Sequence, residues 1–136
     1  MQWTQIALQA SRAADPAGAL RALSAALRAE APLHGAAWVE CDPPAVRARD
    51  GDAAFELSPE LCEVAAHARH AELYPAGTLS RELAAAFPGA EILLVPARHE
   101  GSGGALLLAA PAGAFGDDPA PWRLLGETVA GVAARP

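Results

Sequence analysis

Cys62, His67 and His70 are the residues of this sequence whose types and spacing come nearest to a metal site. A thiolate and two imidazoles suit zinc or iron, and all three residues fall within one predicted helix. However, the step from Cys62 to His67 turns about 140° around a helix, so the three side chains do not converge. We therefore predict no metal site. The histidines are placed either on an exposed helix surface or at the rim of a ligand cavity.

Cys41 and Cys62, the two cysteines of the chain, are the candidates for covalent chemistry. They make no disulfide framework, and no pair of Cys-x-x-Cys motifs indicates a zinc site. Cys41 falls in a predicted buried strand and Cys62 in a predicted helix, which is typical of small, buried or half-buried thiols. We predict no catalytic residue, but a redox enzyme that uses Cys41 or Cys62 is kept as a third hypothesis beside the two given below.

The sequence also contains the residue types of a small-molecule site. Trp38 and Glu40 share one face of a predicted strand, where they could supply an aromatic wall and a polar anchor. Alternatively, Trp38 belongs to the core and Glu40 lies in water near a sheet edge. Phe55 and Tyr74 either close the same cavity or are ordinary core residues. The residues predicted to bind a ligand are Trp38, Glu40, Phe55, His67, His70, Tyr74 and Leu94.

Other motifs lack the surroundings that their chemistry needs. The Gly-rich segment 101–104 lies between two predicted strands, whereas a phosphate-binding loop presents its amides at a helix N-terminus. Arg47 and Arg49 share one side of a predicted strand and could hold an anion, or they lie in water at the sheet edge. No pair of carboxylates is placed for acid–base catalysis.

The apolar periodicity and the capping residues predict the elements that position these side chains. Helices are expected at 2–14, 16–30, 58–74, 78–87 and from Asp118 onward, and strands at 35–42, 45–49, 53–57, 91–98 and 103–110. This order predicts an α+β fold with a central antiparallel sheet of five to six strands. The terminal helices are expected on one face and the mid-chain helices over the other. We predict a single domain over 1–136, with 1–14 as an N-terminal helical extension.

The charge and hydropathy of the chain exclude several classes of partner. Of its 136 residues, 52% are hydrophobic and 19% charged, which is typical of a folded domain. Ten basic residues, all arginine, oppose sixteen acidic ones, so the net charge is −6 and no basic stripe indicates nucleic-acid binding. The apolar stretches are too short and interrupted to span a membrane or act as a signal peptide, and a cytoplasmic location is expected.

At this point the sequence resembles the GAF domain family, over about residues 15–134. The resemblance rests on a strand ending in Val95-Pro96, the turn 99–101, the strand Gly104-Ala-Leu-Leu-Leu108, the segment Phe115-Gly-Asp-Asp118 before a terminal helix, and the first strand at Gly35-Ala-Ala-Trp-Val39. It implies a GAF/PAS-like sensory or regulatory module. Such domains bind a small ligand between the sheet and the mid-chain cover, and they often dimerise through terminal helices.

The sequence departs from the ligand-binding branches of that family. A chain without lysine lacks the Asn-Lys pair of cyclic-nucleotide-binding members, and Cys62 is followed by Glu63 rather than by the histidine of bilin-binding members. Free methionine sulfoxide reductases, the enzymatic branch, use several cysteines around the pocket, and Cys41 and Cys62 do not match that arrangement.

The resemblance therefore predicts a non-enzymatic sensory domain of a bacterial-type signalling protein. It is expected to bind an unidentified small molecule and to form a homodimer through its terminal helices, with no cofactor named. The alternative is a degenerate GAF fold that acts as a dimerisation or scaffold unit without a small ligand.

Overall fold

The fold is built on one five-stranded antiparallel sheet with the strand order β2-β1-β5-β4-β3. The computed structural model describes residues 2–28, 31–51, 55–99 and 102–135. The strands are β1 Gly35–Cys41, β2 Pro44–Asp50, β3 Glu72–Pro75, β4 Glu91–His99 and β5 Ser102–Ala110. The helices are α1 Trp3–Ser11, α2 Pro16–Leu27, α3 Pro59–His67, α4 Ala76–Leu79, α5 Arg81–Ala86 and α6 Ala120–Ala133.

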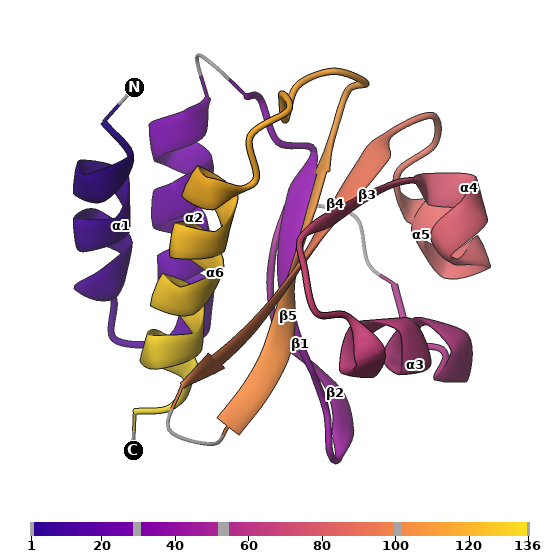
Figure 1. Cartoon of the computed structure of the whole chain (residues 1–136), viewed down its shortest axis with the longest axis horizontal. Coiled ribbons are helices and arrows are strands. Elements are labelled where there is room, and N and C mark those ends of the chain that lie inside the picture. The colour runs from indigo at the N-terminus through magenta and orange to yellow at the C-terminus, as the bar shows by residue number, and fades with distance from the viewer. Residues whose placement is uncertain (1, 29–30, 52–54, 100–101, 136) are drawn as a thin grey trace.

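The elements form three layers (Figure 1). Helices α1, α2 and α6, from the two ends of the chain, cover one face of the sheet, and α3, α4 and α5 lie over the other. The predicted α+β class, the antiparallel sheet and the division of the helices between its faces are confirmed. The first and the last helix of the chain thus lie in the same layer.

The helices begin where the capping residues predict. Pro16 and Pro59 occupy the first helical positions of α2 and α3, where a missing N–H costs nothing. The side chains of Asp15, Ser58 and Ser80 accept hydrogen bonds from the backbone N–H groups of Gly18, Leu61 and Leu83, respectively. Each cap satisfies an N–H that has no partner within its helix.

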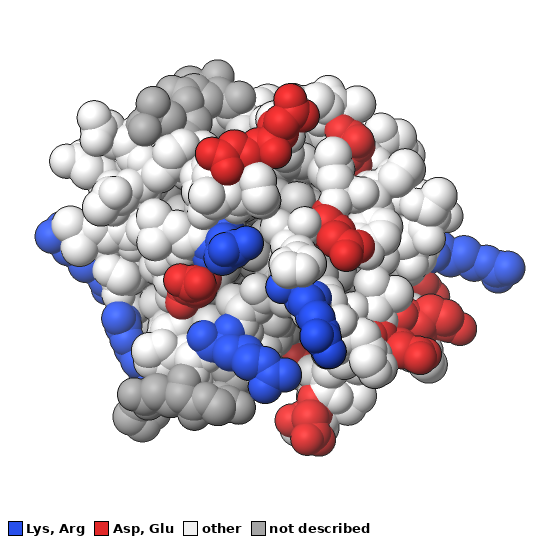
Figure 2. Space-filling model, in the orientation of Figure 1, with Lys and Arg blue, Asp and Glu red and all other residues white. Residues whose placement is uncertain are grey.

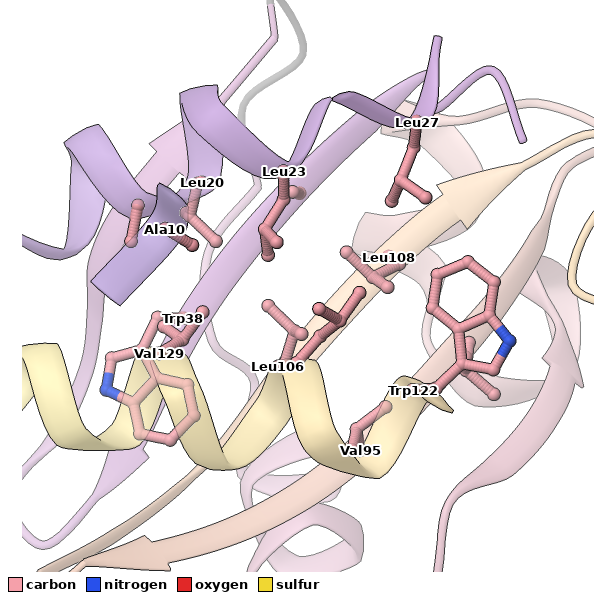
Figure 3. Packing of buried hydrophobic residues seen from close by; sticks show 14 of the residues in the cluster. Ala10, Leu20, Leu23, Leu27, Trp38, Val95, Leu106, Leu108, Trp122 and Val129 are labelled. Carbon is pink, nitrogen blue, oxygen red and sulfur yellow. The ribbon is translucent and has the colours of Figure 1, made fainter. Parts of the chain in front are cut away.

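Two separate hydrophobic cores sandwich the sheet, because successive side chains of a strand point to opposite faces. Trp38 of β1 faces the terminal helices and Val39 faces the mid-chain helices. Figure 3 shows the first core, in which leucines of α2 and residues of α6 close over the sheet. The residues labelled there are Ala10, Leu20, Leu23, Leu27, Trp38, Val95, Leu106, Leu108, Trp122 and Val129.

The middle of the chain differs from the prediction. The helix expected over 58–74 ends at His67, because Ala68 is extended with φ −66° and ψ 135°. Residues Glu72–Pro75 form β3 instead, which pairs with the outer side of β4 from Glu72↔Leu94 to Pro75↔Glu91. Pro75 is tolerated there because β3 is an edge strand.

The strand expected over 53–57 is not formed by residues 55–57, and 53–54 lie outside the described residues. The predicted helix end at Glu30 and the turn at 100–101 also lie outside them. Across the described ranges, no helix combines the length and hydropathy needed to cross a membrane. Figure 2 shows arginines and carboxylates interspersed over one face of the molecule.

Candidate functional site

The structure brings Cys41 and Cys62 together. Cys41 is the last residue of β1, and Cys62 lies in α3, 21 positions later in the chain. The Sγ of Cys41 is 3.4 Å from the carbonyl oxygen of Cys62, and the Sγ of Cys62 is 3.9 Å from the carbonyl oxygen of Cys41. Both thiols are free and half-buried. A strand end and a helix therefore meet through their two cysteines.

The beginning of α3 determines where Cys62 lies. The Ser58 cap and Pro59 fix the first turn, and the N–H of Cys62 donates to the carbonyl oxygen of Ser58 at 2.9 Å. Leu61 and Ala65 are buried against the sheet, one residue before Cys62 and three after it. Because these two residues hold the inner face of α3, Cys62 is placed at the boundary between that face and the solvent.

Cys41 has a strongly perturbed acidity. Burial, together with a hydrogen bond and charge repulsion from Cys62, raises the pKa of the Cys41 thiol to about 12. Burial is the largest of these causes, and it acts by disfavouring the charged thiolate. At neutral pH, Cys41 is therefore a protonated thiol that is held against a second cysteine.

An open groove of about 1280 Å³ lies beside the cysteine pair. Its walls come from the ends of β1, β4 and β5, from α6, and from the C-terminal part of α3 with the segment that follows it. Cys41 lines this groove together with Trp38 and Glu40. The C-terminal end of β1 thus places an indole, a carboxylate and a thiol at the groove.

A polar network fixes the β1 side of the groove. The Trp38 Nε1–H donates to Glu40 Oε2 at 3.0 Å, and Arg47 of β2 donates to Glu40 Oε1 at 2.8 Å. The indole lies against Gly104 of β5, where a Cβ atom would be 2.7 Å from the ring and 2.4 Å from the Val39 carbonyl oxygen. Glycine at 104 is therefore needed for β5 to pass this close to Trp38.

The space between the sheet and the mid-chain helices is filled by side chains. The cavity there measures about 10 Å³, which is room for about one water molecule. Phe55 and Phe87 pack edge to face across it, with their ring centroids 6.4 Å apart. The ligand position expected from the GAF resemblance is thus occupied by the protein's own core.

The residues predicted to bind a ligand are distributed over several places. Four of them line the open groove: Trp38, Glu40, His67 and His70. Phe55 lines the small cavity instead. Tyr74 of β3 donates its hydroxyl hydrogen to Glu72, and Leu94 of β4 is fully buried in the mid-chain core.

The histidines and cysteines do not assemble into a metal centre. His67 and His70 are exposed, and the Nδ1 of His67 bonds the carbonyl oxygen of Glu63 in its own helix at 2.9 Å. Within the part of the chain that the structure describes, no group of three or more His, Cys, Asp or Glu side chains could hold a metal ion. Thiol chemistry remains available to this site.

The residue patterns did not indicate that the cysteines meet. Periodicity gives the face on which each cysteine lies, but 20 residues separate them in the chain, and no local pattern fixes the path of so long a segment. The one indication in the sequence was that it contains two cysteines. That number is as compatible with two unrelated buried thiols as with a pair in contact. Both thiols are half-buried, within the range expected for them, and their contact is a feature that only the structure adds.

The fold of this chain, unlike its sequence, has a match among known proteins. No protein-family model matches the sequence, and no curated protein is similar to it in sequence. A solved structure of similar fold is the free methionine-R-sulfoxide reductase from Neisseria meningitidis in complex with its substrate. The match has a TM-score of 0.67 and 12% sequence identity, and it covers 96% of this chain and 85% of the reductase chain.

This match contradicts the prediction of a non-enzymatic sensory GAF domain, because the solved protein with this fold is an enzyme and no family model supports the GAF assignment. The signalling role and the scaffold alternative depended on the same assignment and are withdrawn with it. The motifs behind the resemblance were a close strand approach, a turn and a helix cap. These features belong to the layered fold, which does not determine function. The comparison thus establishes the kind of fold that positions the cysteine pair.

Proposed function

We propose that this protein is a thiol-dependent reductase that acts on a small sulfoxide, with Cys41 and Cys62 as its redox pair. The observation that carries the proposal is the contact of these two cysteines beside an open groove. The similarity of fold to an enzyme that reduces free methionine-R-sulfoxide supports it and suggests the substrate class.

Two neighbouring thiols supply what the reduction of a sulfoxide requires. A thiolate attacks the sulfoxide sulfur, the oxygen is transferred to the cysteine as a sulfenic acid, and the sulfide leaves. The second thiol then attacks the sulfenic sulfur, so that a disulfide forms and the oxygen departs as water. One sulfoxide and two thiols thus become one sulfide, one disulfide and one water.

The acidity of Cys41 assigns the two roles. Its pKa of about 12 keeps Cys41 protonated at neutral pH, and a thiol is a poor nucleophile compared with a thiolate. We assign the attack on the sulfoxide to Cys62 and the formation of the disulfide to Cys41. We place the protein in the cytoplasm, where thiols are kept reduced and such a pair can be regenerated.

The test is a single turnover of the reduced protein with one equivalent of free methionine-R-sulfoxide and no added reductant. The wild-type protein is expected to form methionine, lose both thiols and yield a Cys41–Cys62 disulfide in peptide mapping. Cys41→Ser is expected to form methionine but to stop at a sulfenic acid on Cys62, which dimedone labels.

Cys62→Ser is the matched control, because it retains Cys41 but lacks the proposed nucleophile. It is expected to form no methionine. Circular dichroism establishes that each variant is folded. Methionine formation by the double serine variant at the wild-type rate would disprove the proposal, as would a wild-type protein that leaves the sulfoxide unchanged.

A further inference from the structure

The groove beside Cys41 contains arginines that the proposed reduction of a sulfoxide does not use. Arg69, Arg98 and Arg123 line it, from the segment after α3, from β4 and from α6, respectively. All three are exposed, and across the described ranges none of them forms an ion pair or a hydrogen bond.

Among the described residues, the arginines that do have partners are Arg47, Arg49 and Arg135. Arg47 pairs with Glu40, and both line the groove, whereas Arg135 donates to the carbonyl oxygens of Ser11 and Ala13. Among the described residues, the carboxylates that line the groove besides Glu40 are Asp42 and Glu127. Three unpaired guanidinium groups thus share one groove in a chain whose net charge is −6.

The groove is large enough to hold a small thiol. Small-molecule sites usually enclose about 300–1,000 Å³, whereas this open groove measures about 1280 Å³. If Cys41 and Cys62 form a disulfide in each turnover, as the proposed function requires, a reductant must reach one of their sulfur atoms. Cys41 is the cysteine of the pair that lines the groove.

We propose that the groove binds the reductant, and that this reductant is a small anionic thiol with at least two carboxylates. Guanidinium groups bind carboxylates by paired hydrogen bonds, which fixes the orientation of the anion as well as its position. The inference rests on the proposed reductase function and adds the source of its electrons.

The exchange balances with two molecules of the thiol. The first thiolate attacks the Cys41 sulfur, the Cys41–Cys62 bond breaks, and Cys62 leaves as a thiolate that takes up a proton. The second thiolate attacks the small-molecule sulfur of the mixed disulfide and releases Cys41. Two small thiols are oxidised to one disulfide, and both cysteines are reduced.

The first experiment measures how fast the oxidised protein recovers its thiols with glutathione, an anionic tripeptide thiol, and with cysteamine, a cationic thiol. Each rate is divided by that of the same thiol with a small model disulfide. Glutathione is expected to be faster by about tenfold, a difference that salt reduces because it screens exposed charges. The variant Arg98→Gln/Arg123→Gln is expected to lose this preference.

Arg81→Gln is the matched control, because Arg81 is an exposed arginine of α5 outside the groove lining. This variant is expected to keep the preference for glutathione. Equal normalised rates for both thiols, or a preference that survives the loss of Arg98 and Arg123, would overturn the inference. Rapid reduction by a dithiol protein, with glutathione inactive, would overturn it as well.

A binding measurement separates this inference from the proposed function. Calorimetry of glutathione with Cys41→Ser/Cys62→Ser involves no redox step, and Arg98→Gln/Arg123→Gln in that background is expected to weaken binding about tenfold. Binding of this kind in a protein that does not reduce the sulfoxide would remove the proposed function but support an anionic groove. Sulfoxide reduction without such binding would remove the groove assignment alone.

Discussion

At the scale of single residues, the cysteine pair consists of two free thiols in contact, one of which has a perturbed acidity. Cys41 is half-buried and its pKa is raised to about 12, so it does not react indiscriminately at neutral pH. In the proposed reaction, a sulfenic acid on Cys62 places an electrophilic sulfur beside the Cys41 thiol. Oxidation of one residue therefore prepares the reaction of the other.

A second perturbed residue can be measured directly, because Tyr74 is the single tyrosine of the chain. Its hydroxyl donates to Glu72, and this hydrogen bond raises the pKa of Tyr74 from 10.0 to about 12. An absorbance titration of tyrosinate is expected to show a raised midpoint, and Glu72→Gln is expected to lower it. Glu56→Gln, which changes an exposed carboxylate elsewhere, is the control.

The sign of the effect on stability follows from the raised pKa. The folded protein holds the Tyr74 proton more tightly than the unfolded chain, so the stabilisation is fully present below about pH 10. It is lost as the pH rises from about 10 toward the folded-state pKa of about 12. A Tyr74 midpoint that is equal in the wild type and in Glu72→Gln would contradict this account.

At the scale of elements, the close contact of α6 with β4 depends on a glycine. A Cβ atom at Gly126 would lie 2.7 Å from Cγ1 of Val95, whereas at Gly131 the nearest atom is 3.7 Å away. Gly126→Ala is expected to lower the free energy of unfolding, because overpacking costs about 1–3 kcal/mol and exceeds the gain in helix propensity.

Gly131→Ala is the matched variant in the same helix and is expected to raise the stability by up to about 1 kcal/mol. Urea unfolding curves measure both changes. Equal stabilisation by the two alanines would mean that α6 does not pack on β4 as described.

At the scale of the whole molecule, the two chain ends are joined by an aromatic cluster. Trp122 of α6 is buried, donates to the Phe115 carbonyl oxygen at 3.0 Å, and packs edge to face on Trp3 of α1 with the ring centroids 5.0 Å apart. Trp122→Ala is expected to cost about 3–5 kcal/mol, measured by chemical unfolding. Trp3→Ala, at a half-buried position, is expected to cost clearly less, and the reverse order would contradict the packing.

The homodimer through the terminal helices stays a prediction. Because Trp122 belongs to the core of one molecule, its replacement tests folding rather than association. Leu8 of α1 and Leu124 of α6 are the exposed leucines of this layer, at 51% and 37% exposure. Light scattering of Leu8→Gln and Leu124→Gln is the appropriate measurement, and a dimer unchanged by both would place the interface elsewhere.

The sequence by itself determined most of the elements and the class of the fold, because these depend on local interactions. The caps at Asp15, Ser58 and Ser80 each act within three residues, and the leucine stripe of α2 repeats within one helix. The edge strand β3 was not recognised, since what makes Glu72–Pro75 extended is pairing with a distant strand, β4.

The tertiary structure alone decided which residues make up the site. Alternation along β1 separates Trp38 from Val39, but it does not say which helices cover each face, or that the mid-chain face is filled by Phe55 and Phe87. The contact of Cys41 with Cys62 depends on the path of the chain from β1 to α3. Such contacts between distant positions come from the packing of whole layers, which no local pattern encodes.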